Sequence, residues 1–194
     1  MIKNVLIQLL IGVGFVTASA VFSAPSVPLR LSENSRYMVD ADGEPFFYLG
    51  DTAWEICHRL SREEVDVYLE DRAEKGFTVI QIVLLAEEDG LRVPNVYGHL
   101  PLVGADPARP ALKPGPRNDY WDHVDYIFDK AEALGLTLAL LPTWGDKWNL
   151  KWGIGPVVFN EENAKVYGKW VGERYAKRDL IWVMGGDRPI ESEA

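Results

Sequence analysis

The chain alternates between two hydrophobic periodicities, and this alternation restricts it to a narrow set of folds. Nearly uninterrupted apolar runs, which are typical of strands covered on both faces, occupy residues 78–85, 137–141 and 180–184. Segments with apolar residues at helical spacing occupy residues 61–76, 119–134 and 160–178. Buried strands that alternate with amphipathic helices predict a parallel sheet with right-handed crossovers.

Capping and turn residues mark the boundaries of the first elements. Ser61, followed by Glu64 three residues later, forms a capping box at the start of the first helix, and Gly76 ends that helix. Before it, apolar runs at residues 29–39 and 46–49 flank an Asp–Gly turn. This arrangement is typical of a β-hairpin.

Two architectures contain such a parallel sheet: the doubly wound open sheet and the (β/α)8 barrel. The dinucleotide-binding fingerprint of the open sheet is absent, because Gly153 and Gly155 have no third glycine and follow no strand. Barrels place their chemistry at the carboxyl ends of the strands, and these ends carry acidic and aromatic residues here. The sequence therefore predicts an α/β fold, the N-terminal half of a (β/α)8 TIM barrel preceded by a short β-hairpin and truncated after the fourth barrel strand.

Each predicted strand end supplies a carboxylate, and two of them also supply tryptophans. These residues are Asp51, Glu87, Asp146 and Asp187 among the acids, and Trp54, Trp144, Trp148 and Trp152 among the tryptophans. Hydrolysis of a glycosidic bond needs two carboxyl groups that flank the scissile bond, and indole faces offer apolar platforms for sugar rings. The pattern favours a glycosidase with Asp187 as its candidate acid.

The same residues have structural interpretations that the sequence leaves open. Two of the acids have basic neighbours with which they could form structural ion pairs, Asp187 with Arg188 and Asp146 with Lys147. Asp51 could cap the short segment 52–56, and Glu87 could be a solvated loop charge. The tryptophans could pack at the end of the barrel instead of binding sugar.

Charge and composition argue against several other classes of protein. The formal net charge is −9 and no run of Lys or Arg exists, so a nucleic-acid partner is not expected. The three histidines, His58, His99 and His123, have no metal-ligand spacing, and neither a metal nor a cofactor is expected. Cys57 is the single cysteine, which rules out an internal disulfide and is typical of a small buried apolar residue.

The N-terminus has the pattern of a secretory signal peptide. Lys3 precedes an apolar run at residues 5–16, and an Ala-x-Ala site ends at Ala20. The apolar run is shorter than the roughly 20 residues of a membrane span. We predict a signal peptide at 1–20, a linker at 21–28 and a partial catalytic domain at 29–194, in a secreted or periplasmic protein with no membrane attachment after cleavage.

Four motifs, in this order along the chain, carry a family resemblance. They are Leu49-Gly-Asp-Thr-Ala-Trp54, the segment 81–98 that runs from Gln81 through Glu87 to Pro94-Asn-Val-Tyr-Gly98, Leu141-Pro-Thr-Trp-Gly-Asp-Lys-Trp148 and Gly185-Gly-Asp-Arg-Pro189. Together they resemble the apiosidase-like glycoside hydrolases, glycoside hydrolase family 140, formerly a domain of unknown function. The resemblance extends from about Leu29 to Pro189.

The resemblance implies a (β/α)8 barrel that releases apiose or a related sugar from plant pectin side chains, with Asp187 as the general acid/base after the fourth strand. It also implies a nucleophilic Glu after the seventh strand and a C-terminal β-domain, which this sequence lacks. Substrate contacts are expected from Asp51, Trp54, Gln81, Glu87, Trp144, Lys147, Trp148 and Arg188. The expected partners are an oligo- or polysaccharide and the missing C-terminal half of the barrel.

From these absences we expect a fragment of a larger enzyme that is inactive, poorly stable or self-associating by itself. A half barrel leaves an open strand edge and an uncovered sheet face. The main alternative is a non-catalytic carbohydrate-binding module with a sugar site lined by tryptophans. A third hypothesis, a cytosolic metabolic α/β enzyme, conflicts with the predicted signal peptide.

Overall fold

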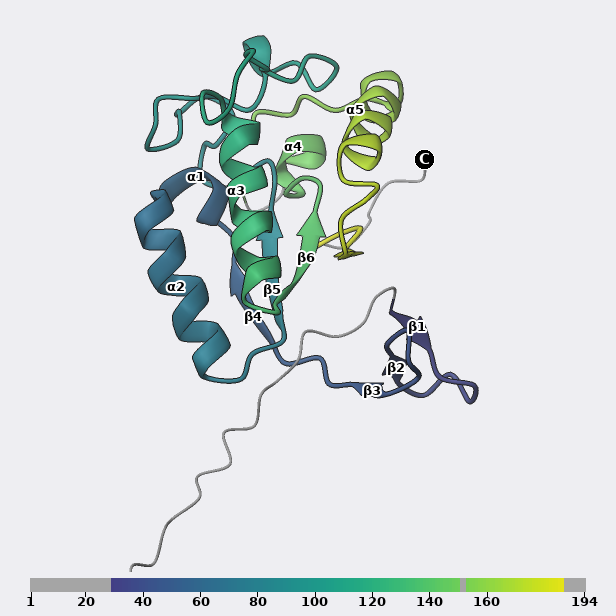
Figure 1. Ribbon diagram of the computed structural model, residues 1–194. Helices are drawn as coiled ribbons and strands as arrows, with labels where there is room; N and C mark the ends of the chain where they lie inside the picture. Colours follow the sequence, from purple (N-terminus) through teal and green to yellow (C-terminus); the bar gives the residue numbers. More distant parts are fainter. Residues whose placement is uncertain (1–28, 151–152, 187–194) are drawn as a thin grey trace, which may run out of the picture.

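The computed structural model describes residues 29–150 and 153–186, which form an α/β unit with two sheets (Figure 1). The strands are β1 (Arg30–Leu31), β2 (Met38–Val39), β3 (Pro45–Phe46), β4 (Gly50–Ala53), β5 (Val79–Val83), β6 (Thr137–Leu141) and β7 (Leu180–Trp182). The helices are α1 (Ile56–Arg59), α2 (Arg62–Glu74), α3 (Tyr120–Ala133), α4 (Asp146–Asn149) and α5 (Glu161–Arg174), with a 3-10 turn η1 (Val103–Ala105). The predicted signal peptide and linker lie outside the described residues.

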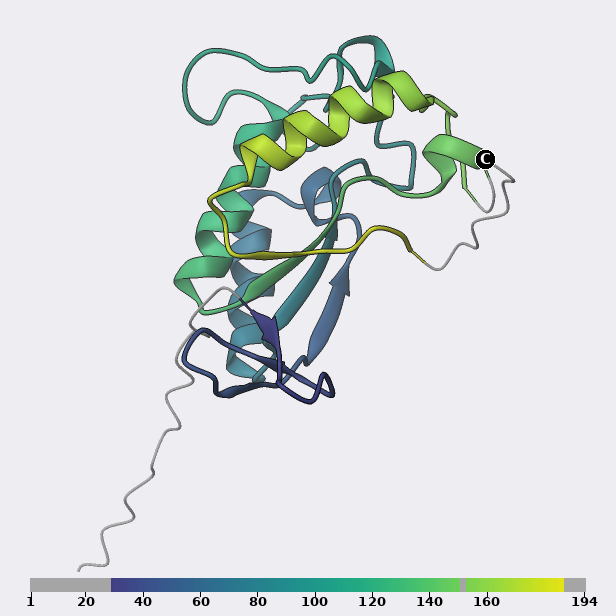
Figure 2. The ribbon, with the colours of Figure 1, turned by 90° about the vertical axis from the view of Figure 1, so that its right-hand side faces the viewer.

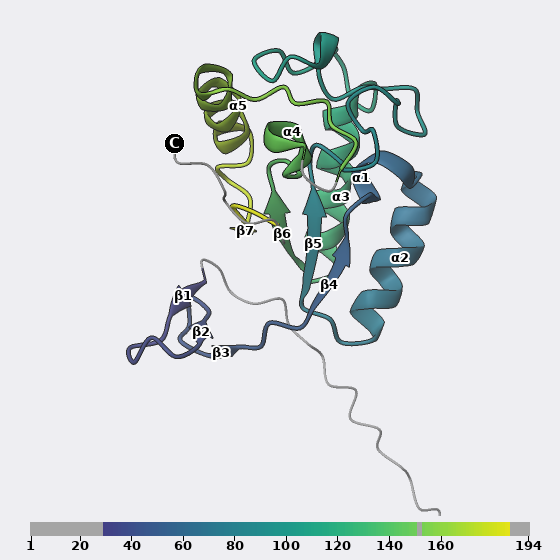
Figure 3. The same cartoon turned by 180° about the vertical axis from the view of Figure 1, so that it is seen from behind.

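Strands β4, β5, β6 and β7 form a parallel sheet in which each strand pairs with its neighbour in the sequence. Because the strands are parallel, their carboxyl ends meet at one edge, where α1 and α4 also lie (Figure 3). The predicted α/β class and parallel sheet are confirmed. The truncated half barrel stays a prediction.

One face of the parallel sheet packs against α2, α3 and α5 (Figures 1 and 2). The apolar residues of this interface include Ile80, Ile82, Leu138 and Leu140 from the sheet, Leu69 from α2, Trp121 and Phe128 from α3, and Val171 from α5. Burial of each such side chain stabilises the fold by roughly 1.5–3 kcal/mol. A loop satisfies one polar atom of this core: the Trp121 indole N–H donates to the Pro101 carbonyl at 2.8 Å.

The other face of the sheet carries a row of small and polar side chains. Thr52, Gln81, Ala139 and Ile181 lie side by side in the register of the four strands. Thr52 is exposed and Gln81 is half-buried, whereas their strand neighbours on the helix face are buried or paired with α2. Figure 3 views the sheet with α3 behind it.

The predicted helix starts are confirmed. The Ser61 hydroxyl accepts the Glu64 N–H at 3.3 Å, and the Glu64 carboxylate accepts the Ser61 N–H at 2.8 Å, so both arms of the capping box are present. Asn160 caps α5 in the same way. That helix ends at Arg174, four positions before the predicted end at 178.

The predicted hairpin is confirmed, but it continues differently from the expectation. Strands β2 and β3 pair antiparallel across the Asp–Gly turn, where Gly43 has a φ of 89°, and β1 adds a third strand. The apolar run 46–49 is not one strand: β3 ends at Phe46, and the first strand of the parallel sheet begins at Gly50. Residues 50–53 are therefore part of a strand, which corrects their predicted place in a loop after a strand end.

The buried His123 on α3 packs edge-on against the ring of Tyr97, with centroids 5.3 Å apart. Its ring nitrogens have no hydrogen bond of good geometry within the described part of the chain. Burial first, and then the nearby Arg62 guanidinium, lower the pKa of His123 to about 4. The neutral ring is thus the form that fits the folded protein.

We expect this histidine to make the fold sensitive to acid. His123 binds its proton with a pKa near 6.5 in the unfolded chain and about 4 in the folded chain. Its contribution to the free energy of unfolding is therefore fully present above pH 6.5 and is lost as the pH falls to 4, by about 3 kcal/mol in total. In a His123→Leu variant, the free energy of unfolding at pH 4.5 should approach its value at pH 7. His99→Leu is the control and should keep the acid sensitivity, because His123 still titrates.

Candidate functional site

A pair of packed tryptophans, tilted with respect to each other, lies at the carboxyl edge of the parallel sheet. Trp54 directly follows β4 and Trp144 follows β6, and their ring centroids are 5.3 Å apart at an interplanar angle of 48°. Both pack on Val83 and Leu141, the last residues of β5 and β6. The structure therefore brings together two predicted site residues from strands that are not adjacent.

The chain after β7 reaches this tryptophan pair. A Cβ atom built on Gly186 would lie 2.8 Å from Cζ3 of Trp144, so the Gly186 main chain rests directly on the indole face. Only a residue without a side chain permits so close an approach. The described chain ends at this contact, and the predicted site residues Asp187 and Arg188 lie outside the described residues, as does Trp152.

This contact makes a sharp prediction for two adjacent glycines. Gly186→Ala should lower the free energy of unfolding by about 1–3 kcal/mol, because Trp144 is only 4% exposed and has little room to move. Gly185→Ala is the matched control, since nothing lies within 4 Å of its Cβ position. Tryptophan fluorescence and urea unfolding report both effects. Equal stability of the two variants would contradict the close contact.

Asp51 was expected beside the tryptophans, but the structure places it in the middle of β4, facing α2. Its carboxylate accepts from the Arg72 guanidinium at 2.8 Å and from the Tyr68 hydroxyl at 3.0 Å. Burial raises the pKa of Asp51, but these bonds and the N–H of Thr52 outweigh it and lower the pKa below its ordinary value. Asp51 thus connects α2 to the sheet and does not lie at the carboxyl edge.

Lys147 was expected to contact substrate, and its placement also differs. Both Asp146 and Lys147 are fully buried on α4, and the ammonium lies 2.9 Å from each carboxylate oxygen of Asp146. It also donates to the carbonyls of Gly155 at 3.2 Å and Glu87 at 3.3 Å. The structural alternative, a pair between Asp146 and Lys147, is the arrangement observed.

The remaining predicted residues occupy different positions around the edge. Glu87 is half-buried in the loop after β5, and Trp148 is half-buried on α4. Gln81 lies deeper, at the middle of β5 on the face shared with Thr52. The carboxyl edge thus combines indole rings with polar side chains, an arrangement that can bind a sugar through ring faces and hydroxyl groups.

The sequence interpretation missed two residues of this edge. The Glu55 carboxylate and the buried His58 ring lie 3.0 Å apart between the end of β4 and the loop after β5. Glu55 follows Trp54 directly, and the spacing of Glu55 and His58 by three positions was the available indication of a contact on a short helix.

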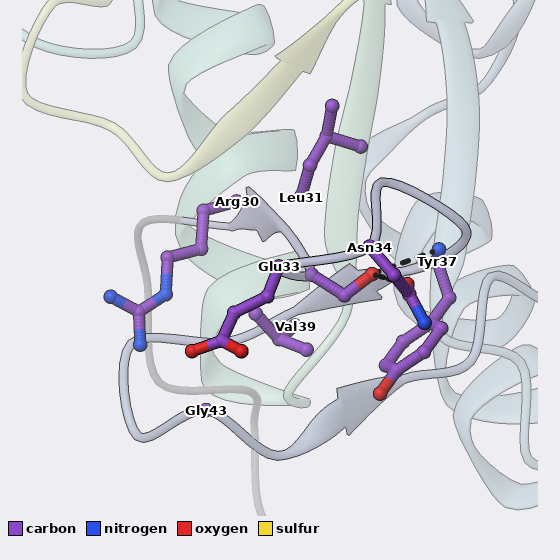
Figure 4. A pocket seen from close by; sticks show the side chains of 8 residues that line it. Arg30, Leu31, Glu33, Asn34, Tyr37, Val39 and Gly43 are labelled. Carbon is purple, nitrogen blue, oxygen red and sulfur yellow. Dashed lines mark hydrogen bonds between the residues drawn. The ribbon is translucent and has the colours of Figure 1, made fainter.

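A separate pocket lies on the small sheet and not at the carboxyl edge (Figure 4). It is lined by Arg30, Leu31, Ser32, Glu33, Asn34, Tyr37, Val39 and Gly43. The small sheet lies by the amino ends of β6 and β7, since Met38 and Thr137 line one hollow together with residues 178–181. This pocket is therefore remote from the tryptophan pair.

The described part of the chain offers neither a metal centre nor a membrane-spanning helix. Within residues 29–150 and 153–186, the structure contains no group of three or more His, Cys, Asp or Glu side chains able to hold a metal ion. In the same ranges no helix combines the length and the apolar character needed to cross a bilayer.

Comparison with known proteins places this geometry in a family. The family model described as "Apiosidase-like, catalytic domain" matches residues 32–194. No curated protein matches the chain. A solved glycoside hydrolase family 5 protein from Bacteroides vulgatus is 32% identical, with a TM-score of 0.73, over 84% of this chain and 33% of its own length.

Two further solved structures extend the comparison. One described as a glycoside hydrolase is 34% identical, with a TM-score of 0.71, over 84% of this chain and 35% of its own length. The endo-1,4-β-mannanase of Rhizomucor miehei has a TM-score of 0.52 at 13% identity, over 78% of this chain and 46% of its own, and is similar in fold alone.

The chain thus spans about a third of the length of the first two solved relatives. The family match, in contrast, covers nearly all of the chain, including every residue of the parallel sheet and of the carboxyl edge. The chain therefore belongs to the apiosidase-like family, within its catalytic domain.

Proposed function

We propose that this chain forms part of a glycoside hydrolase catalytic domain that releases apiose, or a related sugar, from the side chains of plant pectin. The observation that carries the proposal is the contact of Gly186 with Trp144, which in turn packs against Trp54. Asp187 is the next residue in the sequence. Family membership and the two similar glycoside hydrolases support the reaction class.

In the proposed reaction, Asp187 is the general acid and general base. It donates a proton to the glycosidic oxygen as the bond between that oxygen and the anomeric carbon breaks. As this bond breaks, a second carboxylate attacks or stabilises the anomeric carbon, and we assign it to the Glu that the family resemblance places after the seventh strand. Asp187, now ionised, then takes a proton from a water molecule whose oxygen bonds to the anomeric carbon, and the sugar is released. This chain matches about a third of the length of the two solved relatives, and we propose that the strand carrying this Glu lies in the part of the enzyme that the chain does not match.

The proposed sugar contacts come from the carboxyl edge. Trp54, which is partly exposed, offers indole surface to the sugar ring, and the buried Trp144 supports it from behind. Glu87, Trp148 and Arg188 offer further contacts around the ring. Gln81 is proposed to reach the sugar from the sheet face that it shares with Thr52. Asp51 and Lys147 have no place in this proposal, because their charges are already paired with Arg72 and Asp146.

The decisive test is sugar release from apiose-substituted pectic oligosaccharides, followed by separation and identification of the free sugar. Free apiose supports the proposal. If the chain is supplied with the rest of the catalytic domain and binds the oligosaccharide but releases no sugar, the result favours the alternative, a carbohydrate-binding module that uses the same tryptophan pair. We further propose that residues 1–20 direct secretion; N-terminal sequencing of the exported protein tests this.

A further inference from the structure

The Glu55 carboxylate binds two backbone N–H groups at the start of the loop after β5. Oε1 of Glu55 accepts the backbone N–H groups of Glu87 at 3.1 Å and Glu88 at 3.2 Å. Its second oxygen, Oε2, lies 3.0 Å from Nδ1 of His58 and 3.7 Å from Nε of Arg59. The side chain is 19% exposed, so these bonds form in a partly desolvated place where they are stronger than in water.

The same group holds a second point of the loop through His58. Nε2 of this buried ring lies 3.0 Å from the carbonyl oxygen of Val93, while Nδ1 faces Glu55. Glu55 and His58 therefore bind the loop at both ends of the turn formed by residues 88–92. In that turn Asp89 has a φ of 62°, a backbone conformation that needs support from its surroundings.

Glu87 is held from its other side by a second buried charge. Its carbonyl oxygen accepts from the ammonium of Lys147 at 3.3 Å, whereas its N–H donates to Glu55. The two peptide groups that flank the Glu87 Cα are thus bound by charges of opposite sign: the Glu55 carboxylate, just before α1, and the Lys147 ammonium on α4. Side-chain direction follows from the backbone on either side, so this arrangement sets where the Glu87 carboxylate points.

We propose that Glu55 is a positioning residue of the sugar site, which holds the loop after β5 so that Glu87 faces the substrate; this inference rests on the proposed function. Glu55 itself does not contact the sugar. The loop main chain binds the Glu55 carboxylate in its ionised form. Burial raises the pKa of Glu55, but the bonds from His58 and the Glu88 N–H outweigh this effect and lower the pKa. The carboxylate stays ionised and keeps accepting the two N–H groups.

Amide hydrogen exchange by NMR tests the positioning role directly in the full chain. In Glu55→Ala, the exchange of the Glu87 and Glu88 amides should accelerate by about tenfold to a hundredfold, because both lose a charged acceptor. In Glu55→Gln, exchange should stay within about threefold of the wild type, because the amide oxygen still accepts both N–H groups. Its NH2 group can donate to Nδ1 of His58 in the neutral tautomer.

Arg59→Ala is the matched control on the same helix. Its guanidinium pairs with the exposed Glu88 carboxylate and lies beside Glu55, but it makes no bond to the loop main chain in the described residues. Both amides should exchange at the wild-type rate in this variant. Equal exchange in Glu55→Ala and the wild type would overturn the proposal, and so would Glu55→Gln that exchanges as fast as Glu55→Ala.

The kinetics of sugar release from the oligosaccharide by the complete enzyme then distinguish a positioning role of Glu55 from a purely structural one. Glu55→Ala should lower kcat/KM by about tenfold or more at a temperature where it is folded, with Glu55→Gln restoring most of the loss. Wild-type kcat/KM in a folded Glu55→Ala would overturn the positioning role. If the complete wild-type enzyme, including the part that supplies the second carboxylate, releases no sugar, the proposed function fails, and the exchange rates still decide whether Glu55 holds the loop.

Discussion

Replacement of Lys147 by methionine is expected to lower the free energy of unfolding by about 3–5 kcal/mol. The methionine fills most of the volume but leaves the Asp146 carboxylate, which is fully buried, without its positive partner. Removing one member of a buried ion pair has this large cost because the other charge loses water and partner together. The ammonium also donates to Asp146 and to the carbonyls of Gly155 and Glu87, so its loss removes contacts that join these segments at the carboxyl edge.

Urea unfolding, followed by circular dichroism, measures this loss. Lys169→Met is the matched control: that lysine is 76% exposed and lies 3.8 Å from Glu173, so its replacement should change stability by less than about 0.5 kcal/mol. The double variant Lys147→Met/Asp146→Asn should recover part of the loss, because no unpaired charge then stays buried. A Lys147→Met protein as stable as the wild type would show that the pair is not needed.

Replacement of Asp187 by asparagine is expected to reduce kcat for sugar release by about a hundredfold to ten-thousandfold in the complete enzyme. Asparagine has the shape of aspartate but cannot donate or accept the proton of the leaving group. Oligosaccharide affinity should change little, because the tryptophan pair of Trp54 and Trp144 is untouched. Initial rates and calorimetric binding measure the two quantities separately.

Asp179→Asn is the control for this change. Asp179 is an exposed carboxylate that precedes β7, so it lies at the amino end of the strand whose carboxyl end leads to Asp187. Its replacement should leave both the rate and the affinity unchanged. A loss of oligosaccharide affinity in Asp187→Asn equal to the loss of rate would contradict a role in proton transfer, since it would indicate a binding residue.

The elements of the fold were predictable because their determinants are local. The capping box at Ser61 and Glu64, the apolar run at β6 and the Asp–Gly turn before β3 each act within a few residues. Their order along the chain was enough to predict a parallel sheet. The tryptophan pair followed from the same logic, since parallel strands bring their carboxyl ends to one edge.

The errors concern the placement of charged side chains. The boundary between β3 and β4 was misplaced, and Asp51 consequently moved from a predicted loop to the middle of a strand, where it pairs with Arg72. Lys147 was expected to contact substrate, but it is fully buried, where its pairing with Asp146 and two carbonyls compensates for the lost water. The pairing of Lys147 with its neighbour Asp146 was one of the alternatives open from the sequence, whereas its bonds to the Gly155 and Glu87 carbonyls and the pairing of Asp51 with Arg72 join residues far apart in the chain.

By itself, the sequence determined the order and type of the three long helices and of the strands between them, and the edge of the sheet where acidic and aromatic residues collect. Only the tertiary structure decided which of those residues face that edge. The physical reason is that helix caps and apolar periods are short-range, whereas a shift of one residue along a strand turns a side chain to the opposite face. The same holds for the burial of Lys147 and for the hydrogen bonds between Glu55 and the loop after β5. Both depend on partners 8 to 60 positions away in the chain.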